Sequence, residues 1–265
     1  MSYQTIKVRF EEQVCYLQFH RPEDNNTIND CLVEECHQVL ALCEKTITVI
    51  VLEGLPDVFC LGADFKEMHH KIACRQLCEN NPEPLYNLWL RLATGPYVTV
   101  SHVRGKVNAG GVGFIGASDI VLSDYTAKFS LSELLFGLYP ACVLPFLIRR
   151  IGFQKAHYLA LMTQAISIQD AYASGLVDSY EAHSNTLLHK HLLRLRRLSK
   201  TGIMRYKHYM GELHDAMTQS KSLALAANRE MFSDRDNLDK IYHFIEKGQL
   251  PVIRNKEKLN DSICR

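Results

Sequence analysis

Apolar and polar residues follow two different periods along this chain. Residues 6–10 alternate and residues 14–19 are mostly apolar, which predicts a hairpin of two strands. Short apolar runs at 48–52 and 97–103 predict two buried strands. Between the hairpin and these strands, residues 32–43 place apolar side chains at helical spacing on one face. Strands that alternate with helices favour an α/β fold with parallel strands.

The pattern becomes increasingly helical toward the end of the chain. Residues 65–94 predict a helix with a break near residue 81, and short strands are expected at 120–123 and 128–130. Beyond residue 185 an amphipathic helical pattern continues to about residue 247. We therefore expect an α/β core over residues 1–185 and a helical region over residues 186–265.

Composition narrows the class of protein. With 265 residues, 47% hydrophobic and 22% charged, the chain can bury a substantial core and has the balance of an ordinary globular protein. A net charge of +1 argues against a nucleic-acid partner. The locally basic stretch 188–197 is expected to be a solvated helix face. No apolar run approaches the roughly 18 residues needed to span a membrane.

The cysteines and histidines show no metal-binding pattern. The nine cysteines are irregularly spaced without a CxxC pair, and the twelve histidines show no HExxH spacing. We expect no metal and no bound cofactor. The N-terminus carries no secretory apolar segment, so the thiols are expected to be free and the protein cytoplasmic.

Two short glycine turns carry the strongest indication of chemistry. Residues 59–65 read FCLGADF and residues 108–113 read NAGGVG, and each turn follows an apolar strand. Either turn alone is typical of a tight turn and nothing more. Together, two such turns at neighbouring strand ends can direct two backbone N–H groups at one point. That arrangement is an oxyanion hole, which stabilises the negative charge that develops on a polarised carbonyl oxygen.

The order of these turns, followed by AKFSLSELLFGLYP at 127–140, resembles the crotonase (enoyl-CoA hydratase/isomerase) superfamily over nearly the whole chain. The resemblance implies a spiral of ββα turns followed by a C-terminal helical region. It implies assembly into a trimer or hexamer through that region. It also implies that the N–H groups of Ala63 and Gly110 hold the oxygen of an acyl thioester as the thioester becomes an enolate.

Glu133 is the acid–base candidate. It follows an apolar strand, and burial beside apolar neighbours would raise the pKa of its carboxyl toward a useful range. An ordinary glutamate in the first turn of a helix, stabilised by the helix dipole, is the alternative. The resemblance aligns Glu133 with the second catalytic glutamate of enoyl-CoA hydratases, and the first glutamate is replaced by Gly113. The pair that positions water is therefore incomplete, which disfavours hydration but leaves dehydration possible.

Other residues are candidates for substrate contact. The resemblance places Lys66 along the pantetheine entrance and Tyr139 and Cys142 along the acyl pocket. Tyr86 is a further substrate-binding candidate, with core packing as the alternative. Asp64 is expected to be structural. Cys142 has no histidine evidently paired with it, so it is not expected to be a nucleophile.

A narrower resemblance concerns residues 26–29, 102–111 and 132–150, which look like the crotonase-type dehydratases of polyketide β-branching cassettes. It implies a lyase of polyketide antibiotic biosynthesis. Its substrate would be a 3-hydroxy-3-methylglutaryl-type thioester on an acyl carrier protein, from which it removes water. A carrier protein is acidic around its phosphopantetheine, so the docking surface should be basic. The candidates for that surface are Lys66, His69, His70 and Lys71.

Three alternatives remain open at this point. The first is a sibling crotonase-type decarboxylase, which needs no group to protonate a leaving hydroxyl, so the presence of Glu133 argues against it. The second is an enoyl-CoA hydratase that acts on an acyl-CoA. The third is a non-catalytic member that only docks a carrier protein, which the presence of Ala63, Gly110 and Glu133 disfavours.

Overall fold

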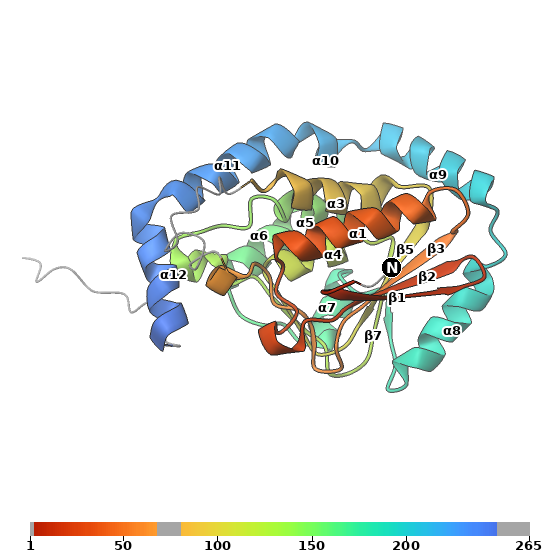
Figure 1. The fold of residues 1–265 in the computed structure, drawn as a ribbon, viewed down its shortest axis with the longest axis horizontal. Helices are drawn as coiled ribbons and strands as arrows, with labels where there is room; N and C mark the ends of the chain where they lie inside the picture. The colour runs from red at the N-terminus through yellow and green to blue at the C-terminus, as the bar shows by residue number, and fades with distance from the viewer. Residues whose placement is uncertain (1–2, 68–80, 248–265) are drawn as a thin grey trace, which may run out of the picture.

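Two sheets form the frame of the computed structural model, which describes residues 3–67 and 81–247 (Figure 1). Within these residues the larger sheet has six strands in the order β1-β2-β3-β5-β7-β9, and the smaller one has the order β4-β6-β8. Only β1 and β2 pair antiparallel, and the other pairs are parallel. The strands of the larger sheet are β1 (Ile6–Glu11), β2 (Val14–Phe19), β3 (Val49–Glu53), β5 (Val98–Val103), β7 (Ile120–Ser123) and β9 (Ser179–Tyr180). Those of the smaller sheet are β4 (Val58–Cys60), β6 (Lys106–Asn108) and β8 (Lys128–Ser130).

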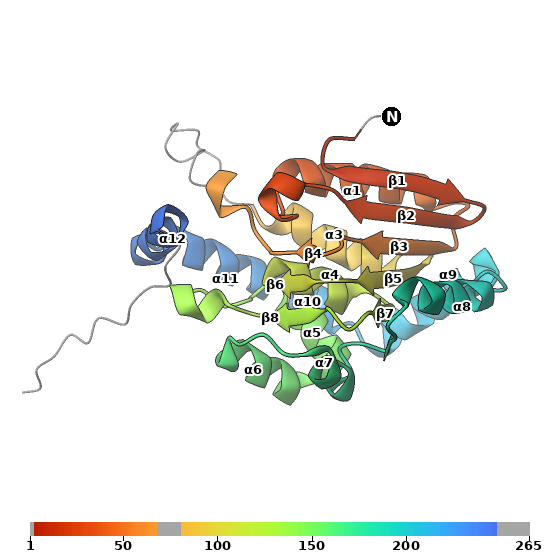
Figure 2. The same ribbon diagram turned by 90° about the horizontal axis from the view of Figure 1, so that it is seen from below.

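A repeated ββα unit connects the two sheets. The chain runs from β5 into β6 and then into helix α4 (Gly110–Ala117), and from β7 into β8 and then into the short 3₁₀ helix η2 (Glu133–Phe136). Figure 2 shows the small sheet beside the large one, with helices around both sheets. This is the spiral of ββα turns that the sequence predicted, so the fold prediction is confirmed. Because β4, β6 and β8 are parallel, their C-terminal ends lie at the same edge of the small sheet. The loops that follow these strands are therefore neighbours.

The central strand β3 shows why these apolar runs form strands. Successive side chains of a strand point to opposite faces. Ile50 and Leu52 belong to the main core beneath the helices α1 (Asp30–Cys43) and α3 (Glu83–Thr94), whereas Val49 and Val51 pack in a second cluster with leucines of α8 (Ser184–Leu195). Both faces are therefore covered, and the strand is continuously apolar, as buried parallel strands usually are.

The helices begin and end where the sequence supplies caps. The side chain of Asn29 accepts a hydrogen bond from the Leu32 N–H and so starts α1. Ser167 and Asp170 form a capping box at the start of α7 (Ile168–Ser174), and Gly175 ends this helix in the left-handed conformation. The remaining helices are η1 (Pro22–Asp24), α5 (Leu144–Ile151), α6 (Phe153–Met162), α9 (Lys200–Leu213), α10 (Ala216–Gln219), α11 (Lys221–Ser233) and α12 (Arg235–Lys247).

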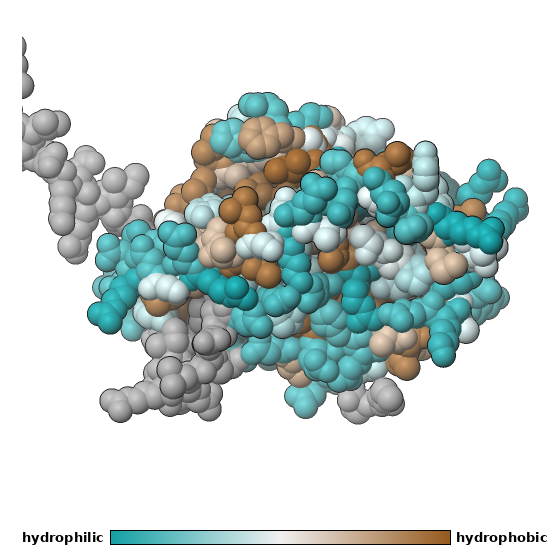
Figure 3. Space-filling model, turned by 90° about the horizontal axis from the view of Figure 1, so that it is seen from above, coloured by the Kyte–Doolittle hydropathy of each residue, from teal (hydrophilic) through white to brown (hydrophobic). Residues whose placement is uncertain are grey.

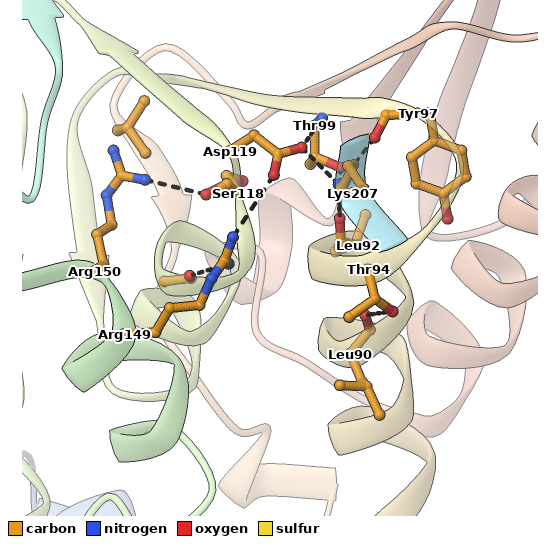
Figure 4. A network of polar contacts seen from close by, with 12 residues as sticks. Leu90, Leu92, Thr94, Tyr97, Thr99, Ser118, Asp119, Arg149, Arg150 and Lys207 are labelled. Carbon is orange, nitrogen blue, oxygen red and sulfur yellow. Dashed lines mark hydrogen bonds and ion pairs between the residues drawn. The ribbon is translucent and has the colours of Figure 1, made fainter. Parts of the chain in front are cut away.

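A buried lysine attaches the C-terminal helices to the core (Figure 4). The Lys207 ammonium of α9 donates to the Tyr97 carbonyl at 2.9 Å, to the Leu92 carbonyl at 3.3 Å and to Asp119 at 2.7 Å. Asp119 also accepts the Thr99 N–H at 2.8 Å. Desolvation lowers the pKa of Lys207, and Asp119 opposes that effect. A buried ammonium is stable only when its charge is paired and its N–H groups are hydrogen-bonded, and these three acceptors meet that need. The contacts of Lys207 therefore fix α9 against β5 and α3.

Sequence-based boundaries agree with the structure within one or two residues for most elements. After β8 the chain forms a 3₁₀ helix at Glu133–Phe136. Much of the helix expected at 65–94 lies outside the described residues, and α3 covers its final part. The division into residues 1–185 and 186–265 stays a prediction, since α8 begins at the proposed boundary and packs on the large sheet.

Candidate active site

The first glycine turn leaves one N–H group without an acceptor. Ile28 donates to the Gly62 carbonyl at 2.7 Å and accepts from the Asp64 N–H at 3.0 Å, which forms a parallel bridge between Ile28 and Ala63. In such a bridge the N–H of Ala63 points away from Ile28. Among the described residues no acceptor for this N–H is found, and Ala63 is only half-buried. The group is therefore available to a ligand.

The second turn places another N–H group, at the start of α4, for which residues 3–67 and 81–247 provide no acceptor. Gly110 is the first residue of that helix, so its N–H has no acceptor inside the helix. Ala109, just before it, has φ 49° and ψ −123°, an unusual conformation for a residue with a side chain. The Ala109 N–H donates to the Ser130 carbonyl at 3.1 Å, which fixes the turn against β8. The positive end of the helix dipole adds to the attraction for negative charge.

The two free N–H groups are neighbours. A methyl group built on Gly62 would lie 3.1 Å from the Gly110 nitrogen, and one built on Gly110 would lie 3.9 Å from the Ala63 nitrogen. Gly62 also has φ +90°, which favours glycine. The structure thus brings together Ala63 and Gly110, which we call the donor pair. Two adjacent donors with no acceptor in the part of the chain that the structure describes have the composition of an oxyanion hole, and this role stays a prediction.

Glu133 presents a buried carboxyl oxygen with no partner. Its Oε2 atom is shielded from solvent and forms no hydrogen bond to any described residue. Burial raises the pKa of Glu133 to about 7, although the backbone N–H groups of Glu133 and Ser132 act in the opposite direction. A buried oxygen without a partner is costly in a folded protein, and such atoms often serve function. A carboxyl with a pKa near neutrality is suited to proton transfer.

Asp64 is the carboxyl of the first glycine turn, and its surroundings differ from those of Glu133. It accepts hydrogen bonds from Arg21 at 2.8 Å, from the Thr27 hydroxyl at 3.2 Å and from the Glu67 N–H at 3.0 Å. Desolvation opposes ionisation, but the Glu67 N–H and the Arg21 guanidinium prevail and lower the pKa of Asp64. Asp64 is therefore a structural residue, as the sequence predicted.

Gly113 has no room for a side chain. A methyl group built there would lie 2.4 Å from the Trp89 ring atom Cζ2. Trp89 is 1% exposed and packs edge-on against Phe114 and Phe146. The indole thus occupies the space into which a side chain at residue 113 would project. The sequence has glycine where the resemblance places the first glutamate, and in the structure the Trp89 indole leaves no room for a glutamate side chain there.

The predicted substrate-contact residues differ in their exposure. Lys66 is exposed, and Tyr139 is 41% exposed. Cys142 is buried, its thiol faces the Ala224 carbonyl at 3.6 Å, and burial raises its pKa to about 12, which disfavours the nucleophilic thiolate. Tyr86 is fully buried and donates its hydroxyl to the Met217 carbonyl at 2.6 Å. The position of Tyr86 therefore supports core packing, the alternative, over substrate binding.

Three polar residues beside the site were not singled out from the sequence. Asn108 ends β6, and its side chain lies between the hydroxyls of Ser130 and Ser132 at 2.8 and 2.9 Å. All three residues are half-buried. The available indication was that Asn108 directly precedes the second turn and the serines directly precede Glu133. Their contact depends on the pairing of β6 with β8, which the sequence pattern does not specify.

Metal binding and membrane insertion find no support in the described part of the chain. Residues 3–67 and 81–247 contain no group of three His, Cys, Asp or Glu side chains that could hold a metal ion. Over the same ranges no helix has the length and apolar character required to cross a bilayer.

Comparison with known proteins identifies the family. A sequence profile of the enoyl-CoA hydratase/isomerase family matches residues 9–253. The chain belongs to this family. It is 61% identical to the bacillaene synthase dehydratase PksH of Bacillus subtilis over 252 residues, which cover 95% of this chain and 97% of that protein. It is 26% identical to the 2,3-dehydroadipyl-CoA hydratase of Escherichia coli over 89% of this chain and 94% of that protein.

Solved structures of the enoyl-CoA hydratase/isomerase family agree with the fold. The crystal structure of the polyketide-biosynthesis enoyl-CoA hydratase PksH from Bacillus subtilis superimposes with a TM-score of 0.92 and 61% identity. It covers 94% of this chain and 100% of that one. The crotonase fold and the narrower likeness to PksH, both expected from the sequence, are confirmed. The family relation makes the chain an enzyme of the hydro-lyase class.

Proposed function

We propose that this enzyme dehydrates a 3-hydroxy-3-methylglutaryl-type thioester carried by an acyl carrier protein during polyketide β-branching. The 61% identity to a dehydratase of bacillaene synthase supports the pathway and the direction of the reaction. The site residues support the chemistry. The observation that carries the proposal is the buried Oε2 of Glu133, which has no partner among the described residues.

In the proposed reaction the donor pair and Glu133 act on opposite parts of the substrate. The N–H groups of Ala63 and Gly110 bind the thioester oxygen, and they stabilise the charge that collects there when the α proton is removed. Glu133, protonated below a pH of about 7, donates its proton to the departing hydroxyl, which leaves as water. The carboxylate that remains accepts the α proton, so the acid is restored for the next turnover. No water has to be activated, and so one carboxyl suffices on this side of the reaction.

Trp89 argues against the two-glutamate mechanism of a typical hydratase. A hydratase needs groups that hold and activate a water molecule on the substrate. Here the indole fills the space beside Gly113, where the family resemblance places the first of two glutamates. With a single acid, loss of water from a tertiary alcohol is the reaction that the remaining groups serve best. The decarboxylase alternative has no departing hydroxyl for Glu133 to protonate.

We propose that the carrier protein docks on a basic surface that includes Lys66. Lys66 is exposed next to Phe65, which packs near Phe232 of α11 at a ring distance of 6.3 Å. His69, His70 and Lys71, the other predicted contacts, lie outside the described residues. Charge reversal by Lys66→Glu should raise KM for carrier-bound substrate and leave a short pantetheine thioester unaffected, because exposed ion pairs act mainly on encounter. An equal effect on both substrates would contradict docking at Lys66.

We also propose that the enzyme is a trimer or hexamer that acts in the cytoplasm. Helix α9 exposes several large apolar side chains, namely Met204, Tyr206, Tyr209, Met210 and Leu213. Figure 3 views the face along which α9–α11 run and shows brown apolar groups among the teal polar ones. Contiguous apolar surface of this kind favours self-association. The six described cysteines are free thiols, which fits a reducing compartment. Light scattering should give a multiple of three chains, and a monomer would contradict the assembly.

Intact-mass spectrometry of a loaded carrier protein tests the function. Carrier protein bearing the 3-hydroxy-3-methylglutaryl group is incubated with the enzyme, and the mass of the acyl group is followed. Loss of one water supports the proposal. Loss of carbon dioxide would indicate the decarboxylase. An unchanged mass of the acyl group on a folded, loaded carrier protein would indicate a non-catalytic docking member. The same acyl group on coenzyme A tests whether the carrier protein is required.

A further inference from the structure

Asn108 stands where the three parts of the candidate site meet. It is the last residue of β6 and directly precedes Ala109 and Gly110 of the second turn. Its backbone carbonyl lies against the first turn, since a methyl group built on Gly62 would be 3.2 Å from that oxygen. Its side chain reaches the segment that carries Glu133. The described structure thus connects the donor pair to the acid through one residue.

The side chain of Asn108 is held between two serines. Its Oδ1 accepts the Ser130 hydroxyl at 2.8 Å, and its Nδ2 donates to the Ser132 hydroxyl at 2.9 Å. The two serines are two residues apart, a spacing that places both side chains on the same side of an extended chain. Leu131 between them points the other way and is 1% exposed. An amide supplies a donor and an acceptor on one planar group, which suits this pair of partners.

Strand pairing makes this contact rigid. Asn108 is opposite Ser130 in the parallel pairing of β6 with β8, and the Ala109 N–H donates to the Ser130 carbonyl at 3.1 Å. Beyond Ser130 the ladder ends, and the chain enters the short 3₁₀ helix at Glu133. The Asn108–Ser132 hydrogen bond is therefore what holds the chain to β6 immediately before the acid.

We infer that Asn108 is a positioning residue that fixes Glu133 relative to the N–H groups of Ala63 and Gly110. The inference rests on the proposed function, because it takes Glu133 as the proton donor. Both polar ends of the Asn108 side chain are already engaged by protein groups, which favours a positioning role over direct contact with substrate. Displacement of a catalytic group by about 1 Å can cost on the order of 10²-fold in rate.

A double-mutant cycle tests this role in the full-length enzyme with carrier-bound substrate. Asn108→Ala should lower kcat by about 10- to 100-fold, with KM changed by less than about 3-fold. In the Glu133→Gln background the same substitution should cost less than about 3-fold, because there is no longer a proton donor to position. An equal loss in both backgrounds would overturn the inference, since Asn108 would then act through the donor pair or on the substrate.

Two further variants separate positioning from folding. Ser132→Ala removes the same hydrogen bond from the other side and should lower kcat by about 10-fold, again only when Glu133 is present. Gln18→Ala serves as the matched control, because it removes a side-chain amide that donates to the Gly54 carbonyl at 2.9 Å from β2 of the larger sheet, whereas Asn108 belongs to the smaller sheet. It should leave kcat unchanged. Wild-type kcat in folded Ser132→Ala would overturn the inference even if Asn108→Ala does not fold.

The single variant Glu133→Gln separates a failure of the proposed function from a failure of the positioning role of Asn108. If Glu133→Gln retains full activity, the proposed function of the acid fails. If Glu133→Gln is impaired while Asn108→Ala and Ser132→Ala are fully active, only the positioning role fails.

Discussion

The carboxyls of Asp64 and Glu133 each follow a strand of the small sheet, yet their environments are opposite. Asp64 accepts hydrogen bonds from Arg21, Thr27 and the Glu67 N–H, and its pKa is lowered. Glu133 has a buried oxygen with no partner among the described residues, and burial raises its pKa to about 7. The pairing of one carboxyl and the isolation of the other separate a structural group from a candidate for proton transfer.

The largest difference between the two carboxyls should appear in the activity of the Glu133→Gln variant. Glutamine keeps the size of the side chain but cannot donate the proton, so kcat should fall by about 10²–10⁴-fold. The measurement is single-turnover dehydration followed by intact mass. Turnover at the wild-type rate would remove Glu133 from the mechanism.

Loss of one member of the donor pair should have the next largest effect. Gly110→Pro deletes the N–H at the first position of α4, where a helix tolerates proline, and kcat should fall by about 10²–10³-fold. Gly110→Ala is the control, since it keeps the N–H and adds a methyl group 3.1 Å from Ile28 Cδ1. A folded proline variant with normal turnover would show that this N–H does not bind the thioester oxygen.

Substitution of Asp64 should affect stability more than chemistry. Asp64→Asn leaves the 11%-exposed Arg21 side chain without its buried charge partner, which should lower the free energy of unfolding by about 3 kcal/mol. Denaturant unfolding measures this loss. Asp64→Asn should lower kcat per folded molecule far less than Glu133→Gln does. The reverse order of effects on kcat would invalidate the assignment of the two carboxyls.

The two carboxyls should also respond oppositely to pH. Since the folded pKa of Glu133 lies above its unfolded value of about 4.5, the folded state loses stability as pH rises from about 4.5 to 7. Glu133→Gln should therefore become more stable than the wild type, by about 1–3 kcal/mol at pH 8, with no such difference at pH 4. For Asp64, whose pKa is lowered, stability is lost as pH falls below its unfolded pKa. Denaturant unfolding of Glu133→Gln across this range tests the first trend, and equal stability at pH 8 would contradict it.

Much of the fold and part of the site follow from the sequence, for reasons visible in particular residues. Apolar runs such as β3 are continuous because both faces are buried, and the first glycine turn is recognisable because close approach and a positive φ exclude a side chain at Gly62. Asn108 escaped notice because its role depends on strand pairing with β8. Tyr86 was predicted to contact the substrate. In the structure α10 packs nearby, and the Tyr86 hydroxyl donates to the Met217 carbonyl of that helix. Long-range contacts of this kind leave no periodic pattern in the chain.

The protonation state of Glu133 decides whether this residue can be the proton donor of the reaction. Infrared difference spectra of the wild type minus Glu133→Gln, recorded from pH 4 to pH 9, isolate the carboxyl stretch of this residue. We predict a protonated carboxyl that titrates with a midpoint near pH 7, together with a kcat that falls as pH rises through the same range. A midpoint near the ordinary glutamate value of about 4.3 would contradict the account.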